Sequence, residues 1–153
     1  MQCESIEKKS FPKLESMSDF MRSEIKGRAR TLLVALLPRE ADSGSTVVAG
    51  YLLFERAALV AHILKLCVAE PMRRRGVGRL LMEAAAQRAR APVRGRASAA
   101  ARPVSAMTLH VDPDRAGAVA LYEKMGFREV SRRLDYYCVG RHAACMELDL
   151  SPC

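Results

Sequence analysis

Three consecutive arginines stand directly before two closely spaced glycines, in the pattern R-x-x-G-x-G that runs from Arg73 to Gly78. An apolar, strand-like run precedes this segment and a helix-like run follows it, so we predict a strand-to-helix turn. Because the glycines have no Cβ, an anion can approach the backbone N–H groups of the first helical turn. The helix dipole and the arginines favour the same negative charge. The turn therefore predicts a site for a diphosphate.

Two other phosphate-binding designs can be compared with this turn. The P-loop pattern G-x-x-x-x-G-K-[ST] does not occur in the sequence. The dinucleotide fingerprint G-x-G-x-x-G fails because Leu81 stands where the third glycine is required. Of the three designs, only R-x-x-G-x-G fits. The alternative is an exposed basic turn without a ligand, which the position between a strand and an apolar helix disfavours.

The elements that must position this turn include several strands. Runs rich in β-branched residues and leucine, and runs that alternate between apolar and polar residues, indicate strands. The first two expected strands form a hairpin around the turn-forming segment PREADSG. The expected strands cover 30–37, 45–54, 58–70, 104–111, 128–140 and 144–150.

Helical spacing of apolar residues indicates the helices. The segment 6–25 predicts one or two short helices, interrupted at Pro12. The helix after the arginines begins at about 76–78 and ends at Pro92. A last helix lies within 112–127, with an Asp as N-cap, Pro113 in its first turn and Gly126 as its C-cap.

This order of elements predicts a mixed α/β (α+β) fold with one central sheet and helices packed on its faces. At 153 residues, the chain is expected to form a single domain over 1–153. The Arg- and Ala-biased stretch 88–103 also contains Pro, Gly and Ser, so we expect a flexible linker within that domain.

The bulk composition bounds the function. Lys and Arg number 25 against 17 Asp and Glu, a formal charge of +8 that favours anionic ligands. The apolar stretches fall short of the roughly 20 residues needed to span a bilayer, and the N-terminus lacks a signal-peptide core, so no membrane association is expected. The five cysteines contain no C-x-x-C pair, which is typical of free thiols in a reducing compartment. We expect a cytoplasmic protein, or a plastid protein if a transit peptide has been removed.

Two motifs in the same order resemble those of the GNAT superfamily of acyl-CoA N-acyltransferases. LCVAEPMRRRGVGRLLM carries R-x-x-G-x-G, and RAGAVALYEKMGF is similar to the family pattern N-x-x-A-x-x-L-Y-x-x-x-G-F. The resemblance extends over roughly Ile6 to Leu150. It implies the GNAT fold, with a mixed, mostly antiparallel sheet in which the strands over 58–70 and 104–111 splay apart.

The resemblance also implies acetyl-CoA as the cofactor. Backbone groups of Leu66, Cys67 and Val68 would pair with its pantetheine arm, as another strand would. The glycine turn would bind its pyrophosphate, and the second motif would add further contacts. The implied cofactor-binding residues are Leu66, Cys67, Val68, Arg73, Arg74, Arg75, Gly76, Val77, Gly78, Arg79, Arg115, Ala118 and Tyr122.

For catalysis, the resemblance implies that Tyr122 protonates the departing thiolate. A phenol pKa of about 10 and a thiol pKa near 8.5 are compatible with that transfer. His110 and His62 match positions where related enzymes carry catalytic groups, and an imidazole with a pKa of about 6.5 is a suitable acceptor for the amine proton. The alternative is that each histidine only forms hydrogen bonds within the sheet.

The resemblance also implies that the acceptor is an amine. AHILKLCV, LHVD and LDYYCVGRHAACMELDL are most similar to the protein N-terminal (Nα) acetyltransferases, including RimI-like enzymes and plant enzymes that also modify lysine. This resemblance implies that Tyr136 and Tyr137 enclose the backbone of an acceptor peptide. A small-molecule amine is an alternative acceptor, and the protein is expected to be a monomer or a homodimer.

The chain departs from the family pattern at two places. Arg115 replaces the asparagine that opens the helix of the second motif, so a usual cofactor contact is lost or becomes a charged one. The family's first strand has no counterpart, because the chain begins within what resembles the first helical region.

Other chemistries fit the sequence less well. Cys138, His142 and Cys145 could supply three zinc ligands, but no fourth is near in sequence, so no metal is expected. Cys67 as a covalent acetyl carrier is weighed against a small buried hydrophobe. A basic nucleic-acid-binding module is an alternative of another class, disfavoured because the chain has no Trp and only 5% aromatic residues.

Overall fold

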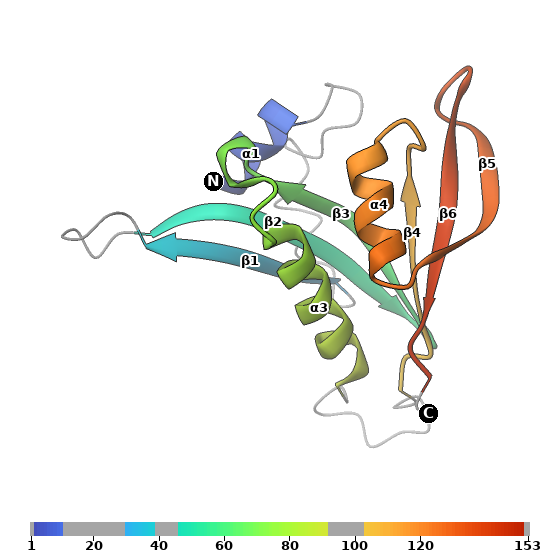
Figure 1. Cartoon of the computed structure of the whole chain (residues 1–153). Helices are drawn as coiled ribbons and strands as arrows, with labels where there is room; N and C mark the ends of the chain where they lie inside the picture. Colours follow the sequence, from blue (N-terminus) through green and yellow to red (C-terminus); the bar gives the residue numbers. More distant parts are fainter. Residues whose placement is uncertain (1, 11–29, 39–45, 92–102, 152–153) are drawn as a thin grey trace. The chain divides into compact units, whose positions relative to one another are not determined.

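A computed structural model (Figure 1) describes residues 2–10, 30–38, 46–91 and 103–151. Its elements follow the predicted order of helix, three strands, helix, strand, helix and two strands. They are α1 (Gln2–Ser10), β1 (Arg30–Pro38), β2 (Thr46–Ala57), β3 (Val60–Val68), the 3₁₀ helix η1 (Glu70–Met72), α3 (Val77–Arg90), β4 (Ala106–Val111), α4 (Ala116–Lys124), β5 (Arg128–Cys138) and β6 (Arg141–Asp149).

The six strands form one sheet in the order β1-β2-β3-β4-β6-β5. β3 and β4 pair in parallel, whereas β6 pairs antiparallel with both β4 and β5. The prediction of a mixed sheet with flanking helices is therefore confirmed.

The chain divides into two compact units. The first comprises Met1–Phe54 and Lys65–Ala85, and the second comprises Glu55–Leu64 and Ala86–Cys153. Each unit is assembled from two separate stretches of sequence.

The first unit buries one face of α1. Cys3 packs with Tyr51 and Cys67, and the partly buried Ile6, Leu32 and Val48 surround them. Glu7 on the same helix is completely buried, where its carboxylate accepts a hydrogen bond from the Tyr51 hydroxyl and lies 3.4 Å from the Lys65 Nζ. A buried carboxylate is stable only when it is paired in this way. These contacts fix α1 to β2 and β3.

Gly50 allows the backbones of β2 and β3 to approach each other closely in the first unit. A Cβ at this position would lie 2.7 Å from the Cys67 carbonyl oxygen and 3.2 Å from the Val68 Cα. It would also lie 3.3 Å from a methyl group of Leu81 on α3. Only glycine fits, so this residue determines how closely β2 lies beside the last residues of β3 and packs against the first turns of α3.

In the second unit, β4 alternates as its sequence predicted. Met107, Leu109 and Val111 are buried, and Thr108 and His110 face the other side of the strand. β6 supplies Ala143, Ala144 and Met146 to the core. These small and flexible side chains allow β4 and β6 to pair closely over the register Ala106–Asp149 to Val111–Ala144.

Helix α4 begins later than predicted and ends where predicted. It starts at Ala116 with Arg115 as the N-cap and no side-chain capping bond, so Pro113 lies before the helix and the Asp N-cap was wrong. Gly126 has a φ of +92°, its N–H bonds the Glu123 carbonyl, and the Phe127 N–H bonds the Tyr122 carbonyl. This pair of bonds is a Schellman motif. It brings the Phe127 ring to 5.8 Å from the Tyr122 ring.

Two other boundary predictions have mixed outcomes. α3 begins at Val77, which confirms the predicted start at 76–78. The helix runs to Arg90, so residues 88–90 are helical and the linker predicted for 88–103 was wrong there. Residues 92–102 of that linker lie outside the described residues, as do 11–29 of the N-terminal helical segment and 39–45 of the first hairpin.

We expect Gly50→Ala to destabilise the protein by about 1–3 kcal/mol, because the new methyl group would overlap a backbone carbonyl that cannot move independently. Gly117→Ala is the matched control, since a Cβ there meets nothing within 4 Å and lies in helix α4. That change should be neutral or stabilising by up to about 1 kcal/mol. Urea denaturation measures both values, and equal stability of the two variants would contradict the role of Gly50.

Candidate functional site

The turn between β3 and α3 has an unusual backbone. Arg74 and Gly76 have φ values of +63° and +80°, in the left-handed region that L-residues other than glycine rarely occupy. A Cβ at Gly76 would meet nothing within 4 Å, so glycine is required there for its conformation and not for packing. A non-glycine residue such as Arg74 in this region stores strain, which is common at functional sites.

The first turn of α3 offers backbone N–H groups. The helical ladder starts with the Leu80 N–H, which donates to the Gly76 carbonyl at 2.9 Å. The amides of Val77, Gly78 and Arg79 come before that bond, and such first-turn amides have no partner within their own helix. Together with the helix dipole, they make this end of α3 attractive to an anion.

The four arginines of this turn differ in their contacts. Arg73 donates from Nε to the Val68 carbonyl at 3.2 Å and from Nη2 to the Ser10 hydroxyl at 3.3 Å. Arg79 forms an i,i+4 ion pair of 2.7 Å with Glu83. Arg73 thus connects the turn to the end of β3 and to α1, while Arg74 and Arg75 lie exposed beside it.

The strand residues predicted to bind a cofactor lie at the end of β3. The register between β3 and β4 covers Val60–Ala106 to Ile63–Leu109, so Leu66 and Val68 lie beyond the last pair in the described ladder. Cys67 between them is buried in the core of the first unit. Burial raises the pKa of its thiol, despite an opposing hydrogen bond with Ser10. A protonated, buried thiol is a poor nucleophile, which disfavours the covalent route.

The two histidines meet in the second unit. The parallel register pairs His62 with Thr108, and the His62 Nδ1 lies 2.8 Å from the Thr108 hydroxyl. His110, two residues further along β4, brings its ring centroid to 5.0 Å from that of His62. Burial lowers the pKa of both imidazoles, and the charge of Arg133 lowers both further. Both rings are therefore neutral at pH 7.

The Tyr136 and Tyr137 side chains extend this pair of rings. Tyr136 stacks on His110 with the ring centroids 5.0 Å apart, and Tyr137 lies edge-on to Tyr136 at the same distance. His62, His110, Tyr136 and Tyr137 thus form one continuous row. The predicted base candidates and peptide-binding candidates are brought together.

A bulge in β5 turns Tyr136 toward His110. The β5–β6 register shifts between Arg133 and Cys138, and Asp135 within the bulge has a φ of +51°. The Asp135 N–H donates to the His142 Nδ1 at 3.0 Å, and its carboxylate accepts from the Gly140 N–H at 2.7 Å. These bonds hold the bulge closed across the hairpin.

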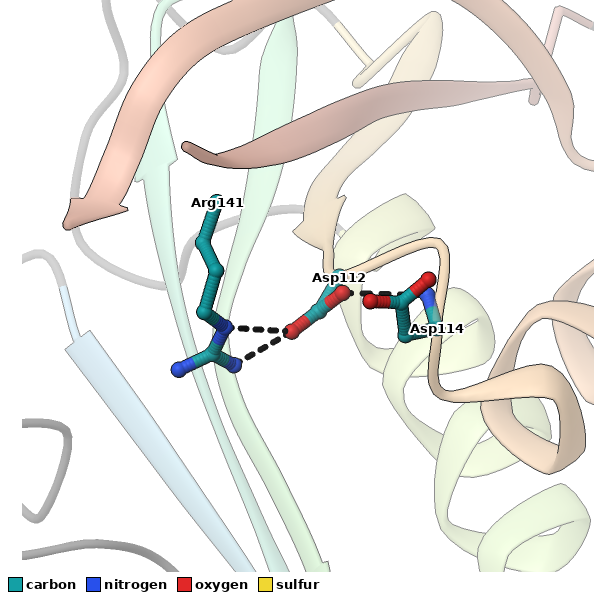
Figure 2. Close-up of polar contacts among 3 residues, drawn as sticks. All are labelled: Asp112, Asp114 and Arg141. Carbon is teal, nitrogen blue, oxygen red and sulfur yellow. Dashed lines mark hydrogen bonds and ion pairs between the residues drawn. The ribbon is translucent and has the colours of Figure 1, made fainter. Parts of the chain in front are cut away.

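Tyr137 contacts an ion pair that sequence reasoning missed, between the partly buried Arg141 and the buried Asp112. Figure 2 shows this ion pair. The guanidinium carbon of Arg141 lies 5.1 Å from the centre of the Tyr137 ring. Arg141 also donates to the carboxylate of Asp112, from Nε at 3.2 Å and from Nη2. Burial raises the pKa of Asp112, but the bonds from Arg141 and from the Asp114 N–H outweigh it and hold the pKa below its ordinary value.

Tyr122 is 7% exposed and packs against Phe127. Burial, with Tyr137 adding to it, raises the pKa of its phenol to about 12, although Arg115 acts in the opposite direction. The phenol is therefore fully protonated at neutral pH. It is a weaker acid than an ordinary phenol, whose pKa of about 10 the sequence analysis assumed.

Two further predicted contacts lie at the start of α4. The Arg115 carbonyl accepts from the Ala118 N–H at 2.9 Å, and the Arg115 N–H donates to the Asp112 carbonyl at 3.0 Å. Both residues are partly buried. They lie in the same unit as Tyr122 and Asp112.

Sequence signals could have indicated two of the missed residues. Gly50 interrupts an apolar strand, which often marks a close backbone approach. Asp112 directly follows a strand and was interpreted only as a helix cap. Asp135, Arg141 and His142 gave no local signal, because their partners depend on how the hairpin folds.

Among the described residues, no three His, Cys, Asp or Glu side chains are grouped so that they could hold a metal ion, and this includes Cys138, His142 and Cys145. No helix within the described ranges is long and apolar enough to cross a bilayer.

Comparisons with solved structures find the same fold elsewhere. The ribosomal-protein-S18-alanine N-acetyltransferase from Escherichia coli aligns with a TM-score of 0.72 at 22% identity, over 99% of this chain and 88% of that one. NAA60 from Arabidopsis thaliana, in complex with a bisubstrate analogue, aligns with a TM-score of 0.76 at 21% identity, over 97% and 91%. An aminoglycoside 6'-N-acetyltransferase complexed with coenzyme A gives 0.72 at 14% identity, over 99% and 91%.

Sequence comparisons identify the family. No curated protein sequence matches the chain significantly. The profile of the acetyltransferase (GNAT) family matches residues 2–127, which include the R-x-x-G-x-G turn, both row histidines and Tyr122. The chain therefore belongs to the GNAT family of acetyltransferases.

Proposed function

We propose that this protein is an acetyl-CoA-dependent N-acetyltransferase whose acceptor is a protein N-terminal α-amine, a lysine amine, or both. The row formed by His62, His110, Tyr136 and Tyr137 carries the proposal. It combines neutral bases with two aromatic rings that can cover a peptide backbone. Solved structures with this fold include the ribosomal-protein-S18-alanine N-acetyltransferase and NAA60, which was crystallised with a bisubstrate analogue.

The chemistry of the first unit fits coenzyme A. We assign the diphosphate to the amides of Val77 to Arg79, with Arg74 and Arg75 adding positive charge. Gly76 leaves the approach to these amides open. The backbone of Leu66 to Val68, beyond the described β3–β4 register, would bind the pantetheine arm. When bound, acetyl-CoA supplies the acetyl group as a reactive thioester.

The second unit would activate the acceptor. An amine is mostly protonated at pH 7, and it must lose a proton before its nitrogen can form the new C–N bond. His110 is neutral and is assigned as the acceptor of that proton, directly or through a water molecule. His62 is assigned a supporting role, because its bond with Thr108 fixes its ring beside His110.

Tyr122 is assigned to the sulfur that leaves as the C–S bond breaks. Its phenol has a pKa of about 12, whereas the thiol formed from the thiolate has a pKa near 8.5, so full transfer of the proton from the phenol to the thiolate is unfavourable. It can donate a strong hydrogen bond to that thiolate. This assignment revises the sequence-based role of Tyr122 from full proton donor to hydrogen-bond donor.

The two units are proposed to act as one catalytic domain. Neither is continuous in sequence, since β2, β3 and α3 each contribute residues to both, and the family profile spans both. The free thiols of Cys3, Cys67, Cys138 and Cys145 favour a reducing compartment such as the cytosol.

A small-molecule amine is the second candidate acceptor. It is favoured by one observation, the shared fold of an aminoglycoside 6'-N-acetyltransferase. An acetylation assay with labelled acetyl-CoA separates the candidates. The panel contains peptides with free N-termini, the same peptides with blocked N-termini and one internal lysine, and a set of aminoglycosides and polyamines.

We expect the free-N-terminal peptides to be acetylated, and the blocked peptides to react only through lysine. Mass spectrometry locates the acetyl group on each product. Turnover of an aminoglycoside or polyamine with no reaction of any peptide would overturn the peptide assignment.

Gly76→Glu should weaken CoA binding by roughly 100-fold or more, because it places a carboxylate where the diphosphate is proposed to bind. The control is Gly140→Glu, which adds the same charge at another glycine with positive φ and open surroundings. Calorimetry with CoA should show near-wild-type affinity for the control. Equal affinity of both variants would remove the site assignment.

Tyr122→Phe should lower turnover by roughly 10- to 150-fold, the effect of losing one hydrogen bond to a charged group. CoA affinity should change little, since the phenylalanine ring can still pack against Phe127. Single-turnover kinetics and calorimetry measure the two quantities separately. Wild-type turnover in this variant would show that another group stabilises the thiolate.

A further inference from the structure

Arg141 forms an ion pair with the buried Asp112 carboxylate, as Figure 2 shows, and its guanidinium also contacts Tyr137 at the end of the ring row. We propose that Asp112 and Arg141 are positioning residues. They hold Tyr137 and, through it, Tyr136, which stacks on His110, and they thereby set the affinity for the acceptor. This inference rests on the proposed function, because it assigns the tyrosine pair to acceptor binding.

The carboxylate end of the connection is firmly held. Asp112 is only 4% exposed, and its Oδ1 accepts the Asp114 N–H at 3.0 Å. Its Oδ2 accepts both bonds from Arg141. The carboxylate is thus fixed by its own turn, so it can serve as an anchor for the guanidinium.

The tyrosine end of the connection lies outside the regular pairing of β5 with β6. The β5–β6 register shifts between Arg133 and Cys138, so Tyr136 and Tyr137 lie in the irregular part of β5. Arg141 is the first residue of β6 and pairs with Cys138, which places its side chain next to this bulge. Its guanidinium covers the Tyr137 ring, and Tyr137 in turn contacts Tyr136.

The chemistry of arginine suits both contacts at once. A planar guanidinium can donate two hydrogen bonds to a carboxylate and still present its face to an aromatic ring. A lysine could keep the ion pair with Asp112, but its ammonium has no flat surface to hold the ring. Arg141→Lys therefore separates the positioning of Tyr137 from the neutralisation of the buried charge.

The experiment compares the wild type with Arg141→Lys, Tyr137→Ala and the double variant. The readouts are KM for a free-N-terminal peptide, kcat, and the NMR signal of the His110 ring C–H, which the stacked Tyr136 ring shifts. Arg132→Lys is the matched control. It changes another arginine of the same hairpin, whose exposed partner is Glu129 at 2.5 Å on its own strand.

We expect Arg141→Lys to raise the peptide KM roughly 3- to 30-fold with little change in kcat, and to move the His110 signal. In the Tyr137→Ala background the same change should have little further effect, since the two residues act as a unit. The control should match the wild type in all readouts. Thermal unfolding confirms that Arg141→Lys stays folded at the assay temperature.

The outcomes separate this inference from the proposed function. An unmoved His110 signal in Arg141→Lys overturns the positioning role, whatever the acceptor is. Independent, additive effects of Arg141→Lys and Tyr137→Ala on KM overturn it as well. A moved signal with an unchanged peptide KM in Tyr137→Ala overturns the acceptor role of the tyrosines, and with it the inferred effect on affinity.

Discussion

The parallel register between β3 and β4 is the constraint on which the second unit depends. Pairing His62 with Thr108 brings the imidazole of one strand beside that of His110 on the next. A slip of one residue would turn one of the rings to the opposite face of the sheet. From His110, the contacts continue through Tyr136 and Tyr137 in the β5 bulge to the Asp112–Arg141 pair. The base candidates are therefore fixed by backbone pairing, and the acceptor candidates by the shape of a hairpin.

In the first unit, the turn between β3 and α3 provides positive potential without burying its arginine side chains. Its proposed anion-binding groups are backbone amides at a helix start, and the arginines beside them are exposed. Arg73, which is also exposed, additionally connects the turn to Val68 and Ser10. The geometry of the amides is thus secured by side chains that need not themselves contact an anion.

Features encoded by neighbouring residues could be predicted from the sequence. The start of α3 follows from Gly76 and the apolar spacing after it, and the end of α4 follows from Gly126. Residues 88–90 fell within both the predicted helix and the predicted linker, and they are helical, because Arg and Ala form helices well.

Contacts between distant residues could not be predicted in the same way. Asp112 and Arg141 are 29 positions apart, and their meeting depends on the β4–β6 register. The bulge at Asp135 breaks strand alternation, so no periodic pattern could place Tyr136 on His110. The family resemblance named the histidines and tyrosines as candidates, but the residues that contact them are brought close only by the folded β5–β6 hairpin.

The buried Glu7 has a consequence for any shortened form of the protein. Loss of α1 would remove the only carboxylate that the described contacts place against both Tyr51 and Lys65. The Tyr51 phenol would then remain without this acceptor in an apolar interior beside Cys67, at a cost of about 1–3 kcal/mol, and Lys65 would lose one of its contacts. The first nine-residue helix thus acts as a structural prerequisite for the strand that is proposed to receive the coenzyme, and a protein translated from a later start codon would be compromised at that strand first.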